Sequence, residues 1–575
     1  MSVFFQDISA DNPIQPGDVN AILRPLNLDI PAEEAADYER LLSAVHDIAV
    51  GVSQLPDYQP LPDTKKYPRE DVHLPGPGEQ EFGNAWVYRF KIQGDNSPSG
   101  TSLKGRTVCV KDCIAIAGVP LSFGSDAFPA WTPQTDATVI TRVLDAGADI
   151  VGTSTCENFC NSTASFTSAQ GIVHNPHQSG YSAGGSTSGG AALVGSGRVD
   201  IALGTDQGGS IRVPSSFCGC VGLKPTHGLV PFSGITSGDP IDDHAGPICR
   251  SVTETAACLD AIAGYDDIDD KSIGAGQHGS FGFSASLQIS DKRLDGIRIG
   301  LLREGFSHAL IDPRVRDHVL AAARKLESLG AIVEEVSIPL HLHGPAIWTL
   351  QQRIAGSSGL VGCATGRRGL GLTEFETRRL PWSNANFQKL FPSTKNTLIN
   401  GQYLLAKFPG LYSKTLNIGR QIRDAYQHAL EKYEVIIMPT TPFVAPRHMD
   451  WTTVLESFEP TIGLTINTAV FNVTGHPAMS IPVGFLPAVD DQNVHLPVGM
   501  QIVGGLWQEK KVLKVGHAWE TNFDWRTEGS GNAVTKDSEE SLTVADRAAL
   551  TMNNIPCAMV SGTRSMDSNH LKLST

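Results

Sequence analysis

The sequence predicts an α/β protein in which helices cover a sheet with parallel strands. A strand–helix–strand order of apolar patterns occurs twice, over residues 107–152 and again over residues 297–336. Strands that alternate with helical patterns are typical of parallel sheets, because each helix carries the chain back along one face of the sheet. We expect three further apolar runs to return the chain to this sheet, at residues 435–438, 479–483 and 498–503.

The composition indicates a globular protein and excludes two classes of partner. Hydrophobic residues make up 41% of the 575-residue chain, which is sufficient for a large core. The net charge of −15 argues against a nucleic-acid partner, since such proteins present basic surfaces. No apolar run approaches the ~20 residues of a membrane span, and residues 1–13 lack a signal-peptide pattern. We therefore expect a cytoplasmic protein that binds neither nucleic acid nor membrane.

The ten cysteines are scattered without the density of a disulfide scaffold, which indicates a reducing compartment. Cys156 with Cys160, or Cys218 with Cys220, could be read as a metal-binding pair. A structural zinc site needs four ligands, and no second pair with a suitable histidine accompanies either of them. We therefore expect buried thiols and no metal.

Changes of composition divide the chain into five segments. Apolar residues at three- and four-residue spacing predict helices before residue 55, and a proline-rich stretch follows them. A tail rich in glycine, serine and charge is typical of a disordered segment or of one that wraps another protomer. We assign residues 1–82 to an N-terminal helical domain and linker, 83–344 to the core, 345–430 to a helical, aromatic-rich cap, 431–526 to a return to the core and 527–575 to the tail.

Two glycine-rich turns lie between residues 182 and 214, and each ends in a serine, Ser186 or Ser210. A run of small residues at 191–195 predicts a tightly packed helix between the two turns. Glycine allows the backbone to adopt a positive φ or to approach another group closely. Such turns can direct backbone N–H groups at a developing negative charge. The stretch is therefore a candidate active site as well as a candidate pair of structural turns.

Three arrangements could activate a serine in this stretch. Ser182 fits the G-x-S-x-G pattern of a nucleophile elbow, but that elbow follows a buried strand, and residues 175–179 predict a turn. Ser210 with His227 would be part of a Ser–His–Asp triad. Lys111 directly follows an apolar run, and burial lowers the pKa of a lysine from ~10.4. A neutral lysine could accept a proton that one serine relays from the other.

The motifs around these residues resemble those of the amidase signature family. The similar stretches are Lys111–Asp112, residues 184–190 and residues 204–214. The spacing of 24 positions between Ser186 and Ser210 is the spacing of that family, and the resemblance extends over residues 85–520. A narrower resemblance, to the enantioselective amidases of bacterial nitrile degradation, rests on the N-terminal helices and on residues 206–209, 227–231, 297–306 and 472–477.

The family resemblance implies a fold and a set of catalytic residues. The implied fold is a large, twisted, mostly parallel mixed sheet covered by helices, with an N-terminal helical domain. The implied triad has Ser210 as nucleophile, Ser186 as the bridging serine after a cis peptide bond, and Lys111 as base. The implied oxyanion hole consists of the backbone N–H groups of Gln207, Gly208, Gly209 and Ser210. Asp206 and Arg212, which flank the nucleophile, are expected to pair and hold its loop.

Departures from the family pattern affect the bridging serine and its surroundings. The common motif is Gly-Gly-Ser-Ser-Gly-Gly, whereas Thr187 and Ser188 follow Ser186 here. Counting back from Ser210 keeps Ser186 in register, and Ser188 stays open as an alternative bridging residue. Cys113 stands where the family often has asparagine.

The resemblance implies an amidase that needs no cofactor and forms an acyl-enzyme. The expected substrate is a small carboxamide, with aromatic and arylalkyl amides as candidates, and the products are a carboxylate and ammonia or an amine. Gly185, Asn161 and Trp348 are the expected substrate-binding residues, and a homodimer is the expected assembly. Three alternatives stay open: a carbamate or ester hydrolase, a transamidase subunit that passes ammonia to a tRNA-bound acyl group, and a catalytically silent scaffold.

Overall fold

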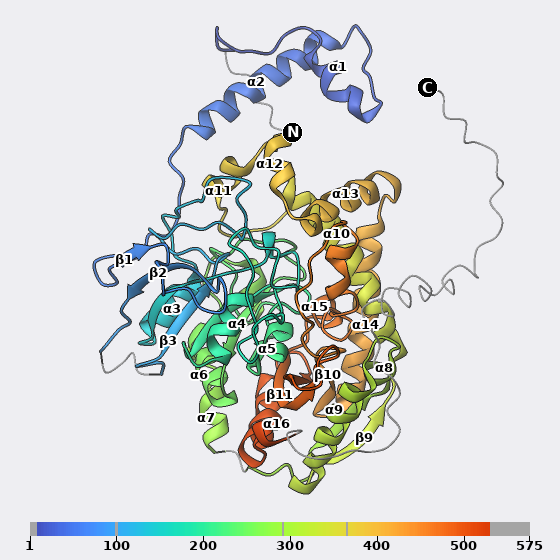
Figure 1. The fold of residues 1–575 in the computed structure, drawn as a ribbon. Helices are drawn as coiled ribbons and strands as arrows, with labels where there is room; N and C mark the ends of the chain where they lie inside the picture. Colours follow the sequence, from blue (N-terminus) through green and yellow to red (C-terminus); the bar gives the residue numbers. More distant parts are fainter. Residues whose placement is uncertain (1–7, 98–101, 290–291, 364–365, 529–575) are drawn as a thin grey trace, which may run out of the picture. The chain divides into compact units, whose positions relative to one another are not determined.

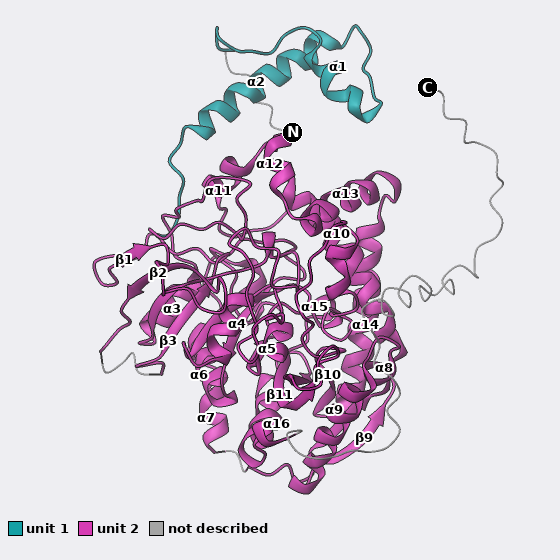
Figure 2. Cartoon of the chain, viewed as in Figure 1, with its two compact units in different colours: residues 1–60 teal, residues 61–575 magenta. Residues whose placement is uncertain are grey.

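The computed structural model in Figure 1 describes residues 8–97, 102–289, 292–363 and 366–528. The chain divides into two compact units, residues 1–60 and residues 61–575 (Figure 2). The predicted tail lies outside the described residues from residue 529 onward. All residues that the sequence nominates for catalysis therefore belong to the second unit.

The first unit is built on two helices, as the apolar pattern predicts. Helix α1 spans Asp18–Leu23 and helix α2 spans Ala35–Ser53. The segment before α1 is attached to α2 through Asp47, whose carboxylate accepts hydrogen bonds from Ser9 Oγ at 2.8 Å and from Asn12 Nδ2 at 2.7 Å. The prediction of N-terminal helices is confirmed.

The second unit is organised around a 12-stranded sheet among its described residues, in the order β1-β2-β4-β3-β5-β7-β6-β11-β12-β10-β8-β9. The predicted apolar runs are present as β3, β4 and β8 to β12. The strands are β1 Glu70–His73, β2 Trp86–Ile92, β3 Thr107–Lys111, β4 Asp149–Ser154, β5 Ile201–Asp206, β6 Val221–Lys224, β7 His244–Cys249, β8 Arg298–Leu302, β9 Ile332–Val336, β10 Val435–Pro439, β11 Ala478–Pro487 and β12 His495–Gly504.

The prediction of a large mixed sheet covered by helices is confirmed, but parallel pairing is less extensive than expected. Among the described strands, β3 is parallel to β4 and β5, and β8 is parallel to β9 and β10. The pairs in the centre of the sheet, from β5 through β7, β6, β11 and β12 to β10, are antiparallel. β6 and β7 are short and contain glycine or proline, which weakens the strand pattern in the sequence.

Helices of the second unit cover the sheet, and those of the predicted cap gather together in Figure 1, where α10 packs along α13 and α14. None of the described helices is both long and apolar enough to span a membrane. The helices are α3 Thr138–Asp145, α4 Ser188–Gly195, α5 Arg212–Cys218, α6 Val252–Ile262, α7 Phe283–Gln288, α8 Arg303–Ser307, α9 Pro313–Lys325, α10 Gly344–Leu360, α11 Thr373–Arg379, α12 Asn384–Lys389, α13 Pro392–Lys407, α14 Leu411–Lys432, α15 Val470–Thr474 and α16 Glu509–Asn522.

The sheet brings the lysine and the glycine-rich stretch together. β3 and β5 are parallel neighbours, and the register places Val110 opposite Leu203. Lys111 therefore ends its strand beside Thr205, just before the second glycine-rich turn. The first turn leads into α4, whose residues 188–194 are all buried between the surrounding elements. Small side chains suit this position, because larger ones would collide with the neighbouring backbone.

Candidate active site

Lys111 points into the protein and not into solvent. Its side chain is completely buried, although it lies at the end of a strand. The Nζ atom donates hydrogen bonds to Ser186 Oγ at 2.8 Å and to Thr205 Oγ1 at 2.8 Å. Buried charged groups are rare unless they are paired or hydrogen-bonded, so this position is suited to a specific role.

The first glycine-rich turn carries Ser186 directly before α4. The peptide bond between Gly185 and Ser186 is cis, as the family resemblance implies. A Cβ atom at Gly185 would lie 2.8 Å from Glu157 Cγ, so this position is closed to a larger side chain. Gly185 therefore shapes the turn that presents Ser186 to Lys111.

The second glycine-rich turn carries Ser210 between β5 and α5. The backbone carbonyl of Ser210 accepts a hydrogen bond from the N–H of Thr187 at 3.3 Å, which joins the two turns directly. Gly209 has a φ of 139°, a conformation that favours glycine. Ser210 is 7% exposed, whereas Lys111 and Ser186 are fully buried. The three residues of the predicted triad thus lie on adjoining segments, with Ser210 the most accessible.

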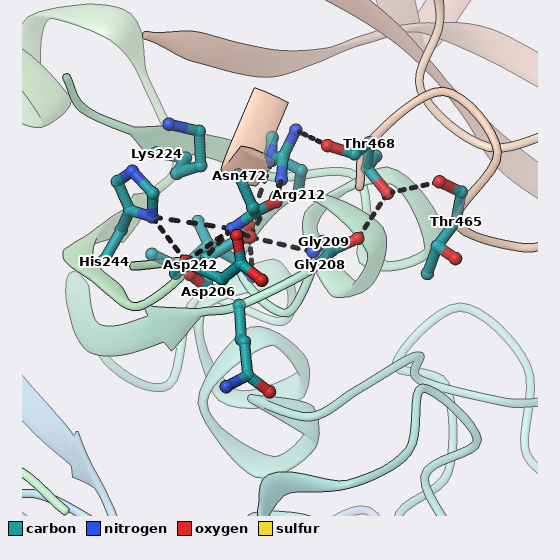
Figure 3. A network of polar contacts seen from close by, with 12 residues as sticks. Asp206, Gly208, Gly209, Arg212, Lys224, Asp242, His244, Thr465, Thr468 and Asn472 are labelled. Carbon is teal, nitrogen blue, oxygen red and sulfur yellow. Dashed lines mark hydrogen bonds and ion pairs between the residues drawn. The ribbon is translucent and has the colours of Figure 1, made fainter. Parts of the chain in front are cut away.

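A buried ion pair holds the loop that carries Ser210 (Figure 3). Arg212 donates to both carboxylate oxygens of Asp206, at 2.8 and 3.0 Å, and both side chains are completely buried. Burial alone would raise the pKa of Asp206, but the Arg212 guanidinium holds it below the usual range. The same carboxylate accepts hydrogen bonds from the N–H groups of Gly209 and Ile211, at 2.8 and 3.1 Å. The expected pairing of Asp206 and Arg212 is therefore present.

The segment around α15 fixes the loop from the other side (Figure 3). Thr468 Oγ1 donates to the carbonyl of Gly208 at 2.7 Å, and Asn472 Nδ2 donates to the carbonyl of Asp206 at 2.9 Å. Asn472 Oδ1 also accepts a hydrogen bond from Arg212 at 2.7 Å. The sequence motifs indicated a resemblance at residues 472–477 without assigning a task to Asn472. Nothing in the sequence singled out Thr468.

One of these contacts involves the N–H of Gly209, a predicted oxyanion-hole donor. The N–H of Gly209 already donates to Asp206 Oδ1 at 2.8 Å, so it supports the loop instead of pointing freely at a substrate. The N–H groups of Gln207, Gly208 and Ser210 remain as candidates. The carboxylate holds the N–H of Gly209 firmly because it carries a full negative charge.

Trp348 contacts the backbone of the loop that carries Ser210. Its Nε1 donates to the carbonyl of Gln207 at 2.7 Å, and a Cβ atom at Gly208 would lie 2.4 Å from its ring. The ring of Trp348 therefore supports the backbone of the Gln207–Gly208 turn, and its substrate-binding role stays a prediction.

A cavity of about 710 Å³ opens beside this loop. Asn161 and Gln207 line it, whereas Gly185 and the predicted triad are not among its described lining residues. The amide of Asn161 donates to Thr397 Oγ1 at 2.6 Å and accepts from Gln352 at 3.4 Å, which fixes its orientation. Aromatic side chains form part of the cavity wall: Phe123, Phe159, Phe232, Phe375 and Tyr412.

The alternative nucleophile arrangements do not assemble. Ser182 Oγ donates to the carbonyl of Ala164 at 3.0 Å and follows a turn, so the nucleophile elbow is absent. His227 lies in a turn, with its Nε2 atom 3.1 Å from the carbonyl oxygen of Pro240. Ser188 Oγ lies 3.1 Å from Glu157 Oε1, whereas Ser186 is the serine that contacts Lys111.

The protonation of Lys111 depends on opposing influences. Burial lowers its pKa, but the nearby sulfur of Cys160 acts in the opposite direction, as do those of Cys113 and Cys156. Together the sulfurs raise the pKa of Lys111 above its ordinary value. The raised pKa favours the ammonium form of Lys111, and the neutral form that the base of an acyl transfer requires becomes more abundant as the pH rises.

Comparison with known proteins identifies the family of this chain. Residues 91–513 match the Amidase family. The enantioselective amidase of Rhodococcus rhodochrous is 38% identical over 436 residues, which cover 73% of this chain and 80% of that protein. The A subunit of glutamyl-tRNA(Gln) amidotransferase from Lachnospira eligens is 33% identical over 421 residues, which cover 73% of this chain and 84% of that protein.

Solved structures show the same fold. The A subunit of glutamyl-tRNA(Gln) amidotransferase from Thermotoga maritima is similar with a TM-score of 0.61 and 28% identity, over 76% of this chain and 87% of that chain. The native peptide amidase from Stenotrophomonas maltophilia gives a TM-score of 0.60 and 28% identity, over 73% of this chain and 83% of that chain. The matched region contains both glycine-rich turns and Lys111. The chain therefore belongs to the amidase signature family and is an enzyme of the amidase type.

Proposed function

We propose that this enzyme hydrolyses the C–N bond of a small carboxamide through Ser210, Ser186 and Lys111. The 2.8 Å contact between Lys111 Nζ and Ser186 Oγ carries this proposal. A completely buried lysine bonded to a serine that adjoins a second serine is a pathway for proton transfer. The resemblance of both turns to the amidase signature family supports the same assignment.

In the proposed reaction, Ser210 Oγ attacks the carbonyl carbon of the amide. The proton of Ser210 moves to Ser186 Oγ, while the proton of Ser186 moves to the neutral amine of Lys111. The carbonyl oxygen becomes an oxyanion near the N–H groups of Gln207, Gly208 and Ser210. Loss of one such donor typically lowers the rate by ~10²–10³-fold.

The leaving group receives its proton by the reverse route. Lys111 returns a proton to Ser186, which protonates the amide nitrogen as the C–N bond breaks. Ammonia or an amine leaves, and the acyl group stays on Ser210 as an ester. Water then attacks this ester with the same residues as base and acid, which releases the carboxylate and restores the free hydroxyl.

The volume and the lining of the cavity favour a small substrate with an aromatic or arylalkyl acyl group. Its volume of about 710 Å³ falls in the range of sites for drug-sized molecules. Phe123, Phe159 and Phe232 supply an apolar wall, and the amides of Asn161 and Gln207 supply polar groups beside it. Aromatic walls favour aromatic ligands through burial and edge-to-face contacts. We propose this cavity as the acyl pocket, and a homodimer as the assembly on the basis of the family resemblance.

Single substitutions in the triad test the proposal. We expect Ser210→Ala and Lys111→Ala each to lower kcat/KM for a primary aromatic amide or an anilide by more than ~10³-fold, since each removes a group on which bond formation depends. Ser182→Ala is the matched control, because this serine fits the hydrolase pattern but bonds the carbonyl of Ala164. Near-normal activity of either triad variant would refute the assignment.

The similarity to the A subunits of glutamyl-tRNA(Gln) amidotransferases supports a second candidate, release of ammonia from glutamine for transfer. The net charge of −15 argues against a direct tRNA contact. Carbamates and esters would be cleaved by the same acyl-enzyme chemistry. A panel of aromatic amides, aliphatic amides, glutamine, carbamates and esters, assayed with the purified protein, ranks these candidates. Highest kcat/KM on glutamine would favour the transamidase.

A further inference from the structure

Glu157 is a buried acidic residue in contact with the turn that carries Ser186, and the reaction proposed above does not use it. Its side chain is completely buried. Among the described residues, its carboxylate is bound by hydrogen bonds and by no ion pair. Burial of a carboxylate without a cation is costly unless hydrogen bonds replace those to water. An acidic residue in this position is therefore suited to a specific task.

The sheet brings Glu157 to the bridging serine. The parallel register of β3 and β4 sets Lys111 opposite Ser154, the last residue of β4, and Glu157 follows three positions later. The N–H of Glu157 donates to the carbonyl of Ser186 at 3.2 Å. Ser186 thus has two attachments: its hydroxyl is bonded to Lys111 at the end of β3, and its carbonyl to Glu157 just after β4.

The side chain of Glu157 contacts both sides of Ser186. Its Oε1 atom accepts a hydrogen bond at 3.1 Å from Ser188 Oγ, which belongs to the first residue of α4. Its Oε2 atom accepts from the N–H and the Oγ1 of Thr167, at 3.1 and 2.7 Å. A Cβ atom at Gly185 would lie 2.8 Å from Glu157 Cγ, so the stem of the side chain packs against the residue before Ser186. Glu157 therefore contacts the turn before, at and after the bridging serine.

We propose that Glu157 is a positioning residue for Ser186: its N–H and its carboxylate hold the turn and the start of α4, so that Ser186 Oγ stays within hydrogen-bond distance of Lys111 Nζ. The inference rests on the proposed function, because Glu157 acts through the bridging serine of that reaction. It forms no bond with the substrate. Proton transfer requires donor and acceptor atoms within ~2.6–3.2 Å, so a displaced turn interrupts the transfer.

This role depends on the reach of the side chain and not on its charge. Burial raises the pKa of the Glu157 carboxyl to about 7, although the hydrogen bonds from Thr167 and Ser188 oppose that rise. A neutral amide of the same size can make the same contacts. In Glu157→Gln, the amide oxygen can accept both hydrogen bonds from Thr167, and the amide N–H can donate to Ser188 Oγ. The hydroxyl of Ser188 can then donate to the carbonyl of Thr155, which lies 3.3 Å away.

Three substitutions at this position separate reach from charge. Glu157→Ala removes every hydrogen bond of the side chain, so we expect kcat for a primary aromatic amide to fall by ~10²-fold. KM should change by less than about threefold, because Phe159 and Asn161 in the cavity wall are held by contacts of their own. Glu157→Gln should keep kcat within about threefold of the wild-type value. Glu157→Asp is too short to reach both partners and should lose about tenfold or more.

Two further variants complete the test. Ser188→Ala breaks the bond between Glu157 and α4 from the other side, so its effect on kcat and that of Glu157→Ala should not add. Glu304→Ala is the matched control, because its buried carboxylate on α8 also accepts from a hydroxyl and a backbone N–H, those of Ser337 at 2.6 Å and Ile338 at 2.9 Å. We expect it to lower the thermal unfolding temperature without lowering kcat.

The outcomes distinguish this inference from the proposed function. Wild-type kcat in Glu157→Ala, a loss in Glu157→Gln as large as in Glu157→Ala, or additive effects of Glu157→Ala and Ser188→Ala would overturn the inference. If Glu157→Ala does not fold, Ser188→Ala decides, since a wild-type kcat there would also overturn it. Activity retained in Ser186→Ala would instead refute the proposed function, whatever the Glu157 variants do.

Discussion

In the proposed reaction, the hydroxyl of Ser186 accepts one proton and releases another. Ser186 Oγ accepts a hydrogen bond from Lys111 Nζ, and the N–H of the next residue, Thr187, donates to the carbonyl of Ser210. Proton transfer between these groups requires donor and acceptor atoms within hydrogen-bond distance. The distances between the side chains therefore matter before the pKa values of the groups do.

The buried ion pair behind Ser210 is expected to be sensitive to loss of one partner. Asp206→Asn leaves the guanidinium of Arg212 buried without its counter-charge. We expect the free energy of unfolding, measured by urea titration, to fall by ~3–5 kcal/mol. Asp424→Asn is the control, since its pair with Arg423 is exposed and contributes about 1 kcal/mol or less. Equal effects of the two substitutions would contradict a structural role for the buried pair.

Residue types, spacings and the family resemblance together predicted the candidate triad, because its members lie in local sequence motifs. The glycine-rich turns and the strand-end lysine nominated Lys111, Ser186 and Ser210, and the structure brings these residues onto adjoining segments. The engagement of Gly209 with Asp206 and the role of Thr468 were not predicted. Both depend on side-chain directions after folding, and Thr468 is 260 positions from the carbonyl that it binds.

At the scale of elements, α10 contributes Trp348, which supports the loop that carries Ser210. Because a Cβ atom at Gly208 would lie 2.4 Å from the ring, we expect Gly208→Ala to displace the Gln207–Gly208 turn and lower kcat by ~10²-fold. In a Trp348→Leu background the same substitution should cost much less, because the colliding ring is gone. Steady-state kinetics of the four proteins form a double-mutant cycle.

A glycine-to-alanine substitution at a position without close neighbours serves as the control for Gly208→Ala. Gly51 lies on α2 with open space around its Cα, so Gly51→Ala should leave kcat unchanged. Additive effects of Gly208→Ala and Trp348→Leu would contradict direct contact as the cause.

β5 and β7 escaped prediction, because glycine or proline interrupts their apolar patterns. β5 runs into the loop of Ser210, and Gly204 within it lies against Thr187, where a Cβ atom would come within 3.0 Å of the hydroxyl. β7 pairs with β5 despite a glycine and a proline. Strand patterns were clear where an uninterrupted apolar run marks the strand, as in β3 and β10.

At the scale of the whole molecule, the N-terminal helices form the first unit, and the residues proposed for catalysis all belong to the second. We expect the chain that lacks residues 1–60 to fold and to retain kcat/KM for an aromatic amide, since the triad and cavity lie in the second unit. Thermal unfolding and kinetics of the truncated and full-length proteins test this expectation. Loss of activity in a truncated protein that unfolds cooperatively would assign a catalytic contribution to the first unit.

The contacts of the site also join parts of the chain that are far apart in sequence. Lys111 and Ser186 are separated by 75 positions, and Asp206 and Asn472 by 266 positions. Each such contact closes a long loop, which slows folding because chain entropy is lost before the contact forms. The loop of Ser210 is complete only when the segment that includes α15 has docked. During refolding, therefore, the recovery of hydrolytic activity should report the last long-range assembly steps and lag behind the recovery of helical structure.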